Sequence, residues 1–209
     1  MVYDWPIGVD GFIPTQFEFG ANPATVAEES VLNGGIQTTN VPGKRWLLAM
    51  TLPNGAVKDG VRAAVEGFLD RLNGQEHSVN FWHLQRFGVG GWGYPKGSIN
   101  QAGVTVKTNT AQFGLSLPLT GCGAGNTLEA GDLLSVNGQL IMCPVRTLAD
   151  GSGDLVVPVS GGLRAAALAT APVTLVRPTA KFMLANSQWR SGYAPGRAEV
   201  LALDWIERF

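Results

Sequence analysis

The sequence predicts a mainly β protein with one amphipathic helix. Glycine and proline are frequent, at 28 and 12 of 209 residues, and they separate short apolar runs. This is the pattern of many short strands joined by turns. An Asn-Gly pair at residues 137–138 stands between two apolar runs, which is the strongest short-range signal for a β-hairpin. Only one longer segment shows a helical period.

That helix is expected over about residues 55–73. Its apolar residues recur at the spacing of one helical face: Val57, Val61, Val65, Phe68, Leu69 and Leu72. Asn54 suits the N-cap, and Asn73-Gly74 suits the end, because glycine accepts the left-handed conformation there. A second, short helical turn is expected over Pro23–Glu29, with Asn22 as its cap.

Strands are expected on both sides of the main helix and through the second half of the chain. Trp46–Leu52 is apolar on both faces, which predicts a central strand, and Val79–Leu84 follows the helix, so that this region reads as a local β-α-β unit. The later expected strands are Leu133–Val136, Gln139–Cys143, Leu155–Val159, Val173–Val176 and Glu199–Ile206, with a turn at Asp150–Gly153.

The predicted architecture is a β-sandwich core made from both ends of the chain, residues 1–120 and 179–209. A small β-barrel-like unit is inserted at residues 121–178. A chain of 209 residues fits one domain with a small insertion and needs no metal or disulfide to fold. The two cysteines, Cys122 and Cys143, make no disulfide framework and are expected to be reduced.

The charge content and the distribution of apolar residues bear on the partners that the protein could have. Charged residues make up 15% of the chain, against a usual soluble average of about 25%. This shortage favours burial of part of the surface against other subunits, although an ordinary glycine-rich β protein is the alternative. The net charge is -1 and no basic run is present, so nucleic-acid binding is not expected. Neither a signal peptide nor an apolar run long enough to span a bilayer is expected.

No catalytic, cofactor-binding or metal-binding residues are predicted, so the protein is not expected to be an enzyme. His77 and His83 lack the closely spaced partners of a zinc site and the signature of a nucleophile. Residues 121–125 resemble a phosphate loop in composition, but no helical period follows them. Glu129 and Asp132 could form a carboxylate pair, yet an aspartate just before a strand more often caps a turn.

Four aromatic residues in glycine- and proline-rich loops are the candidate interface: Trp92, Tyr94, Trp189 and Tyr193. Loop aromatics are enriched at interfaces because a flat apolar ring with a polar tip gives a large contact area. They could equally stack on sugar rings or fold back over the core. Three other tryptophans lie in strand patterns and are expected in the core: Trp46, Trp82 and Trp205.

Three parts of the chain resemble phage tail proteins of the distal-tail type, and with their flanking strands they cover about half of it. They are the strand–helix–strand block that ends in residues 68–75 and is followed by Phe81-Trp82, the loop at residues 91–97, and the run at residues 130–138 with its continuation at 150–153 and 162–164. The last part holds an Ala-Gly-Asp that opens a strand, a glycine turn, a later Asp-Gly pair and a Leu-Arg before a final strand, a run that phage tail sequences often carry.

The resemblance implies a non-catalytic subunit of a six-membered ring at the distal end of a phage tail. Such a ring links the tail tube to the tip or baseplate. The implied partners are further copies of the chain, the tail tube protein, the tape measure and the tail hub or baseplate proteins. The implied location is the virion, after assembly in the host cytoplasm.

The sequence departs from the family pattern in one respect. No long belt segment is recognisable in residues 1–45, which leaves the ring-closing contacts unassigned. The alternative function is a carbohydrate-binding β module, either the receptor-binding part of a tail or a secreted lectin.

Overall fold

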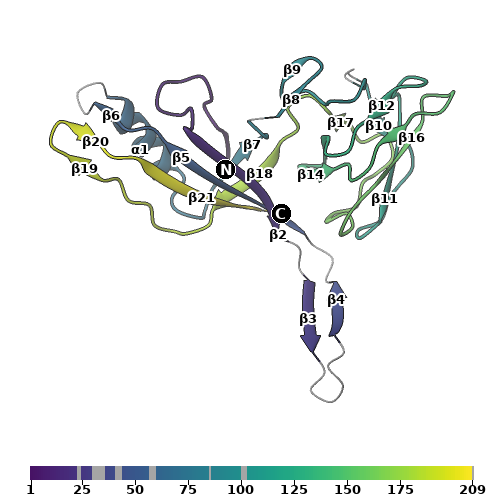
Figure 1. Ribbon diagram of the computed structural model, residues 1–209, viewed down its shortest axis with the longest axis horizontal. Helices are drawn as coiled ribbons and strands as arrows, with labels where there is room; N and C mark the ends of the chain where they lie inside the picture. Colours follow the sequence, from purple (N-terminus) through teal and green to yellow (C-terminus); the bar gives the residue numbers. More distant parts are fainter. Residues whose placement is uncertain are drawn as a thin grey trace. The chain divides into compact units, whose positions relative to one another are not determined.

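The computed structural model describes residues 1–22, 25–29, 36–40, 44–56, 60–84, 86–99 and 103–208. These residues form many strands and a single helix, so the predicted mainly β class is confirmed (Figure 1). The chain divides into two compact units. The first holds Met1–Gly20, Trp46–Leu84 and Ala180–Phe209, and the second holds Ala21–Arg45 and Gln85–Thr179.

The first unit is built on a six-stranded mixed sheet with the order β1-β7-β18-β21-β5-β2. Its strands are β1 (Val2–Asp4), β2 (Gln16–Asn22), β5 (Arg45–Leu52), β7 (Ser78–Phe81), β18 (Ala180–Leu184) and β21 (Leu201–Glu207). β1 runs parallel to β7, whereas β7, β18, β21 and β5 pair antiparallel in turn. A second, three-stranded sheet joins β6 (Gly55–Ala56), β19 (Tyr193–Ala194) and β20 (Arg197–Ala198).

The sheet order corrects the predicted β-α-β unit. β5 and β7, the strands that flank the helix in the sequence, are separated in the sheet by β18 and β21 and run in opposite directions. The cause lies at the C-terminus, where β21 pairs with β5 over six positions from Leu201 to Ile206. A strand that arrives from the end of the chain therefore occupies the place that a parallel crossover would need.

The single described helix, α1, spans Val61–Arg71 and begins later than predicted. Gly55 and Ala56 form β6 and pair with β20, so Gly60 rather than Asn54 stands at the N-cap. The end agrees with the sequence, since Asn73 and Gly74 both have positive φ. Leu69 and Val65 are buried. The ring of Phe68 packs edge-on against Trp5 at 5.5 Å and Phe12 at 5.6 Å.

The short helix predicted over Pro23–Glu29 is wrong. Thr25–Glu29 forms strand β3, which pairs antiparallel with β4 (Ile36–Asn40), and Asn22 is the last residue of β2; residues 23–24 lie outside the described part. Neighbouring β-branched residues at 25 and 26 lower the helix propensity, and pairing with β4 decides the outcome. These two strands form a sheet of their own within residues 1–45, where the sequence shows no belt segment.

Apart from β3 and β4, the strands of the second unit are short and surround one apolar core. They are β8 (Phe87–Gly88), β9 (Gly91–Trp92), β10 (Thr105–Val106), β11 (Ser116–Thr120), β12 (Thr127–Leu128), β13 (Leu133–Val136), β14 (Gln139–Met142), β15 (Thr147–Leu148), β16 (Leu155–Pro158) and β17 (Val173–Thr174). The sheets β10-β11-β16 and β14-β13-β17 continue into one another, because Val106 N donates to Ala171 O and Val173 N donates to Val104 O, each at 3.0 Å. Both sheets contribute to the core, as Leu117 and Leu134 show.

The pairing of β10, β11 and β16 sets the extent of this second unit. Residues 85–120 belong to it, whereas the sequence pattern placed them with the chain termini. β11 pairs with β16 from Ser116 opposite Pro158 to Leu119 opposite Leu155, so the segment before residue 121 shares its core with the segment after it.

The predicted hairpin at Asn137-Gly138 is confirmed. β13 and β14 pair from Leu133 opposite Met142 to Val136 opposite Gln139, and the two turn residues have φ of 50° and 74°. Positive φ at both positions fits a tight turn whose twist matches that of the strands.

The Gly138→Val substitution is therefore expected to cost about 1–3 kcal/mol, since it places a β-branched side chain at positive φ. Thermal unfolding measures this loss. The matched control is Gly151→Val, in a turn where a Cβ would meet no atom within 4 Å and φ is not positive; it is expected to cost less than about 0.5 kcal/mol. Equal melting temperatures for Gly138→Val and the wild type would contradict the turn geometry.

Candidate interaction surfaces

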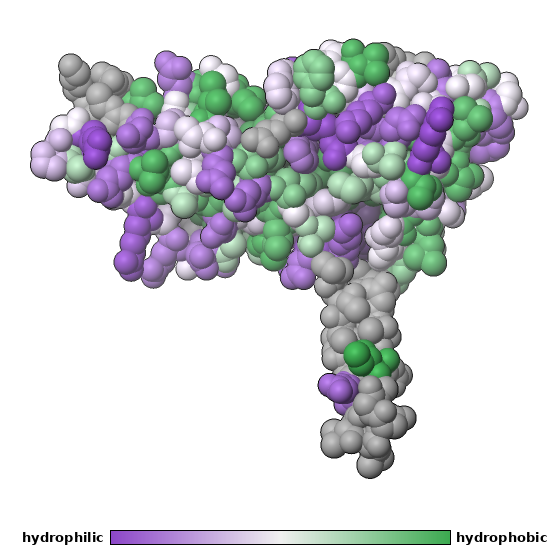
Figure 2. All heavy atoms as spheres, in the orientation of Figure 1, coloured by the Kyte–Doolittle hydropathy of each residue, from purple (hydrophilic) through white to green (hydrophobic). Residues whose placement is uncertain are grey.

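An exposed apolar hairpin is the most distinctive surface of the second unit. β8 and β9 with the turn between them, residues 87–92, are named here the aromatic hairpin. Phe87, Val89 and Trp92 on it are 60%, 75% and 54% exposed, and the Phe87 and Trp92 rings meet edge-on at 5.3 Å. Figure 2 shows hydrophobic surface, in green, at the edge where Figure 1 labels β8 and β9. The sequence pattern predicted Trp92 as an interface residue but not Phe87 or Val89.

The Tyr94 ring packs against the turn of the aromatic hairpin. It fills the space beside Gly90, where a Cβ would lie 2.2 Å from a ring carbon. Backbone bonds hold the base of the hairpin, with Val89 N donating to Pro95 O at 3.1 Å and Gly93 N to Arg86 O at 2.7 Å. The apolar tip is thus carried on an ordered base, with Tyr94 half-buried against it.

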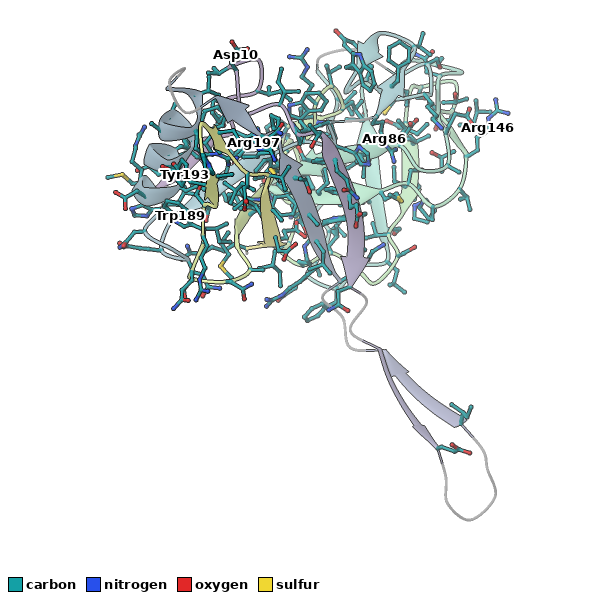
Figure 3. All side chains as sticks on the ribbon, turned by 60° about the vertical axis from the view of Figure 1, so that its left-hand side comes forward. Asp10, Arg86, Arg146, Trp189, Tyr193 and Arg197 are labelled. Carbon is teal, nitrogen blue, oxygen red and sulfur yellow. The ribbon has the colours of Figure 1, made fainter. Side chains whose placement is uncertain are left out.

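Asp132 fixes the loop that follows the aromatic hairpin. The side chain is 1% exposed. Its Oδ1 accepts from Lys96 N at 2.7 Å, and its Oδ2 accepts from Gly97 N at 2.9 Å and from Glu129 N at 2.8 Å. Burial lowers the pKa of Arg86, labelled in Figure 3, while the nearby negative charge of Asp132 acts in the opposite direction.

This arrangement decides between the two interpretations of Glu129 and Asp132. Asp132 caps its turn through the backbone N–H of Glu129, and the Glu129 carboxylate pairs instead with Arg146 at 3.1 Å. The turn-capping interpretation is confirmed. The Ala-Gly-Asp run therefore ties the loop at residues 96–97 to the start of β13.

The other two candidate aromatics belong to the first unit. Trp189 and Tyr193, both labelled in Figure 3, come from the stretch between β18 and β20. Tyr193 is 53% exposed, and its hydroxyl donates to Glu66 on α1, an interaction that raises the pKa of Tyr193. Trp189 is half-buried and lines an open cavity of about 540 Å³.

Of the tryptophans predicted in the core, two are buried and one is not. Trp46 is 3% and Trp205 is 1% exposed, whereas Trp82 is half-buried just after β7 ends. Trp5, which the sequence pattern did not single out, is 6% exposed and donates from its indole nitrogen to Phe12 O at 2.9 Å.

The remaining chemical candidates occupy structural positions. His83 packs against the rings of Phe17 at 5.5 Å and Phe19 at 4.9 Å. Residues 121–125 connect β11 to β12, so a strand and not a helix follows the glycines. Within the described residues, no three His, Cys, Asp or Glu side chains gather as a metal site would require, and no helix is long and apolar enough to span a membrane.

Comparison with known proteins adds no family. No protein-family model matches the chain, and no curated protein matches it.

Both cysteines are free thiols, and each is fully buried. Burial raises the pKa of Cys122 to about 11 from an ordinary 9.0, and it also raises the pKa of Cys143. Folding thus favours the neutral form of the Cys122 thiol. The resulting stabilisation of the folded chain is fully present below pH 9.0 and is lost as the pH rises towards about 11.

Alkylation with iodoacetamide should therefore be slow at pH 8 in the native protein and should reach both thiols in denaturant, because reaction needs an accessible thiolate. Mass spectrometry counts the modified sites. A disulfide between Cys122 and Cys143 under non-reducing conditions would contradict the free thiols and would favour the secreted-lectin alternative.

Proposed function

We propose that this protein is a structural subunit of a phage tail, which forms a ring at the distal end and links the tail tube to the tip or baseplate. The observation that carries the proposal is the aromatic hairpin. Its three large apolar side chains project into solvent from an ordered base. Contiguous exposed apolar surface of this kind marks interaction sites, and the tail resemblance suggests which partners would cover it.

The rigidity of the aromatic hairpin supports a contact with another protein. Glycine-rich loops lose much entropy when they become ordered on binding. Here the Tyr94 ring and the hydrogen bonds to Arg86 O and Pro95 O order the loop in advance. The cost of binding is lower as a result, and Trp92 is suited to be an anchor, since tryptophan is enriched among the residues that dominate binding energy.

The β3–β4 hairpin gives a second reason to expect assembly. A two-stranded sheet alone is marginally stable in water. Among the described residues, β3 and β4 pair only with each other. Their outer edges would be stabilised by the surface or a strand of a neighbouring subunit, which would supply the ring-closing contact that residues 1–45 left unassigned.

Of the four candidate interface residues, Trp92 and Tyr94 belong to the aromatic hairpin and its support. Trp189 and Tyr193 lie in the other unit, and the proposal does not depend on them. The carbohydrate-binding alternative has one observation in its favour, the cavity beside Trp189.

Immunogold labelling of intact tailed particles that carry this protein tests the proposal. Gold at the far end of the tail, together with a tape-measure gene just upstream of the gene for this chain, is the expected result. Label on the capsid, or particles that carry no label after purification, would contradict a distal-tail position.

A further inference from the structure

The cavity beside Trp189 lies wholly within the first unit. It forms at the end of β18, where Leu184 is the last paired strand residue and the chain turns away while β21 continues. Leu184 and Leu203 line it and are 2% and 3% exposed, so its base is apolar and anchored in the core. Its volume of about 540 Å³ falls within the range of roughly 300–1,000 Å³ that is typical of small-molecule sites.

Side chains with polar groups line this cavity. Asn186, Gln188, Trp189, Arg190 and Asp204 all line it. In the described part of the chain, none of the five makes a side-chain hydrogen bond or an ion pair. An aromatic ring, a guanidinium, a carboxylate and two amides thus line one hollow, and the described part of the chain leaves their hydrogen-bonding groups open to a ligand.

The position of Asp204 keeps its carboxylate open. It lies on the exposed side of β21, opposite Ala49 of β5, and its backbone oxygen accepts from Ala185 N at 2.8 Å. Its neighbours Ala49 and, just after β18, Ala185 have small side chains, and Asp204 is exposed. Arg190 lines the same cavity, and in the described residues it forms no ion pair with Asp204.

This set of groups fits one class of ligand. We propose that the cavity binds a saccharide, whose ring packs on Trp189 and whose hydroxyl groups bond to Asp204 and its polar neighbours. A pyranose has an apolar C–H face and a rim of hydroxyls that both donate and accept. Carboxylates only accept, guanidinium groups only donate and amides do both, which together satisfy such a rim. A purely apolar ligand would leave these polar groups without partners, at a cost in free energy.

The inference goes beyond the proposed ring and does not depend on it, because all the residues concerned belong to the first unit of one chain. Saturation-transfer NMR of the full-length protein tests it, with methyl glycosides of glucose, galactose, mannose and N-acetylglucosamine as probes. At least one probe is expected to bind the wild type at millimolar concentration.

Two variants locate the site. Trp189→Ala and Asp204→Asn are each expected to weaken binding about tenfold or more. Leu148→Ala, at an exposed residue of the other unit, should bind as the wild type does. Asp204→Asn keeps the size of an exposed side chain, so it remains informative if Trp189→Ala fails to fold. Failure of all four probes to bind, or binding that survives both substitutions, would overturn the proposal. Loss of ring formation in Trp189→Ala, with no sugar bound by the wild type, would assign the cavity to a neighbouring chain instead.

Discussion

The Asp132→Ala variant is expected to lose about 3–5 kcal/mol of unfolding free energy, because it removes a buried carboxylate and leaves its partners unsatisfied. Three backbone N–H groups donate to this side chain, and that of Gly97 is buried. Arg86 would also lose the negative charge that offsets its burial. The loop after the aromatic hairpin should loosen as the fold weakens.

Denaturant titration of two aspartate variants measures this effect. Asp150 is the matched control, since its Oδ1 also accepts from two backbone N–H groups, of Ser152 and Asp154, but on the surface. Asp150→Ala is expected to cost about 1 kcal/mol, as for a typical exposed cap. Equal losses for the two variants would show that the burial of Asp132 contributes nothing.

The Trp92→Ala variant is expected to weaken subunit association by about 2 kcal/mol or more, the usual effect of truncating an anchor tryptophan. Trp92 is 54% exposed and meets the ring of Phe87, so its removal should take away contact area without opening the core. The melting temperature of the dissociated chain should therefore stay close to that of the wild type.

Sedimentation equilibrium across a range of concentrations compares the association constants. Leu148→Ala is the control, because Leu148 is 65% exposed in the same unit but outside the aromatic hairpin. Unchanged association in Trp92→Ala would remove the aromatic hairpin from the interface. A large fall in the melting temperature of Trp92→Ala would instead show that Trp92 stabilises the fold of the single chain.

The sequence predicted best where the determinants are local. The Asn137-Gly138 turn needs positive φ at both residues, and the end of α1 at Asn73-Gly74 needs the same conformation, so residue type alone locates them. The start of α1 was misplaced because Gly55 and Ala56 pair with Ala198 and Arg197, more than 140 residues further along the chain. Helix propensity carries no information about such a partner.

The candidate surfaces also separate into features with local determinants and features that depend on residues far along the chain. Trp92 and Tyr193 could be found as aromatics in glycine-rich loops, and both are exposed. Phe87 and Val89 were missed, although apolar residues spaced by glycines around a Gly-Gly pair are a recognisable hairpin pattern. The partners of Asp132 could not be read from the sequence, since its bond to Gly97 N spans 35 positions.

Native mass spectrometry of the purified protein at micromolar concentration tests the central claim, that this chain is a ring-forming subunit. We expect one dominant closed species, a hexamer, at six times the subunit mass of 22.1 kDa, and we expect Trp92→Ala to shift it towards smaller species. A closed ring of another size would still agree with an assembly role and would correct the number of subunits. A strictly monomeric protein, both in solution and in images of intact particles, would show that this chain does not form a ring.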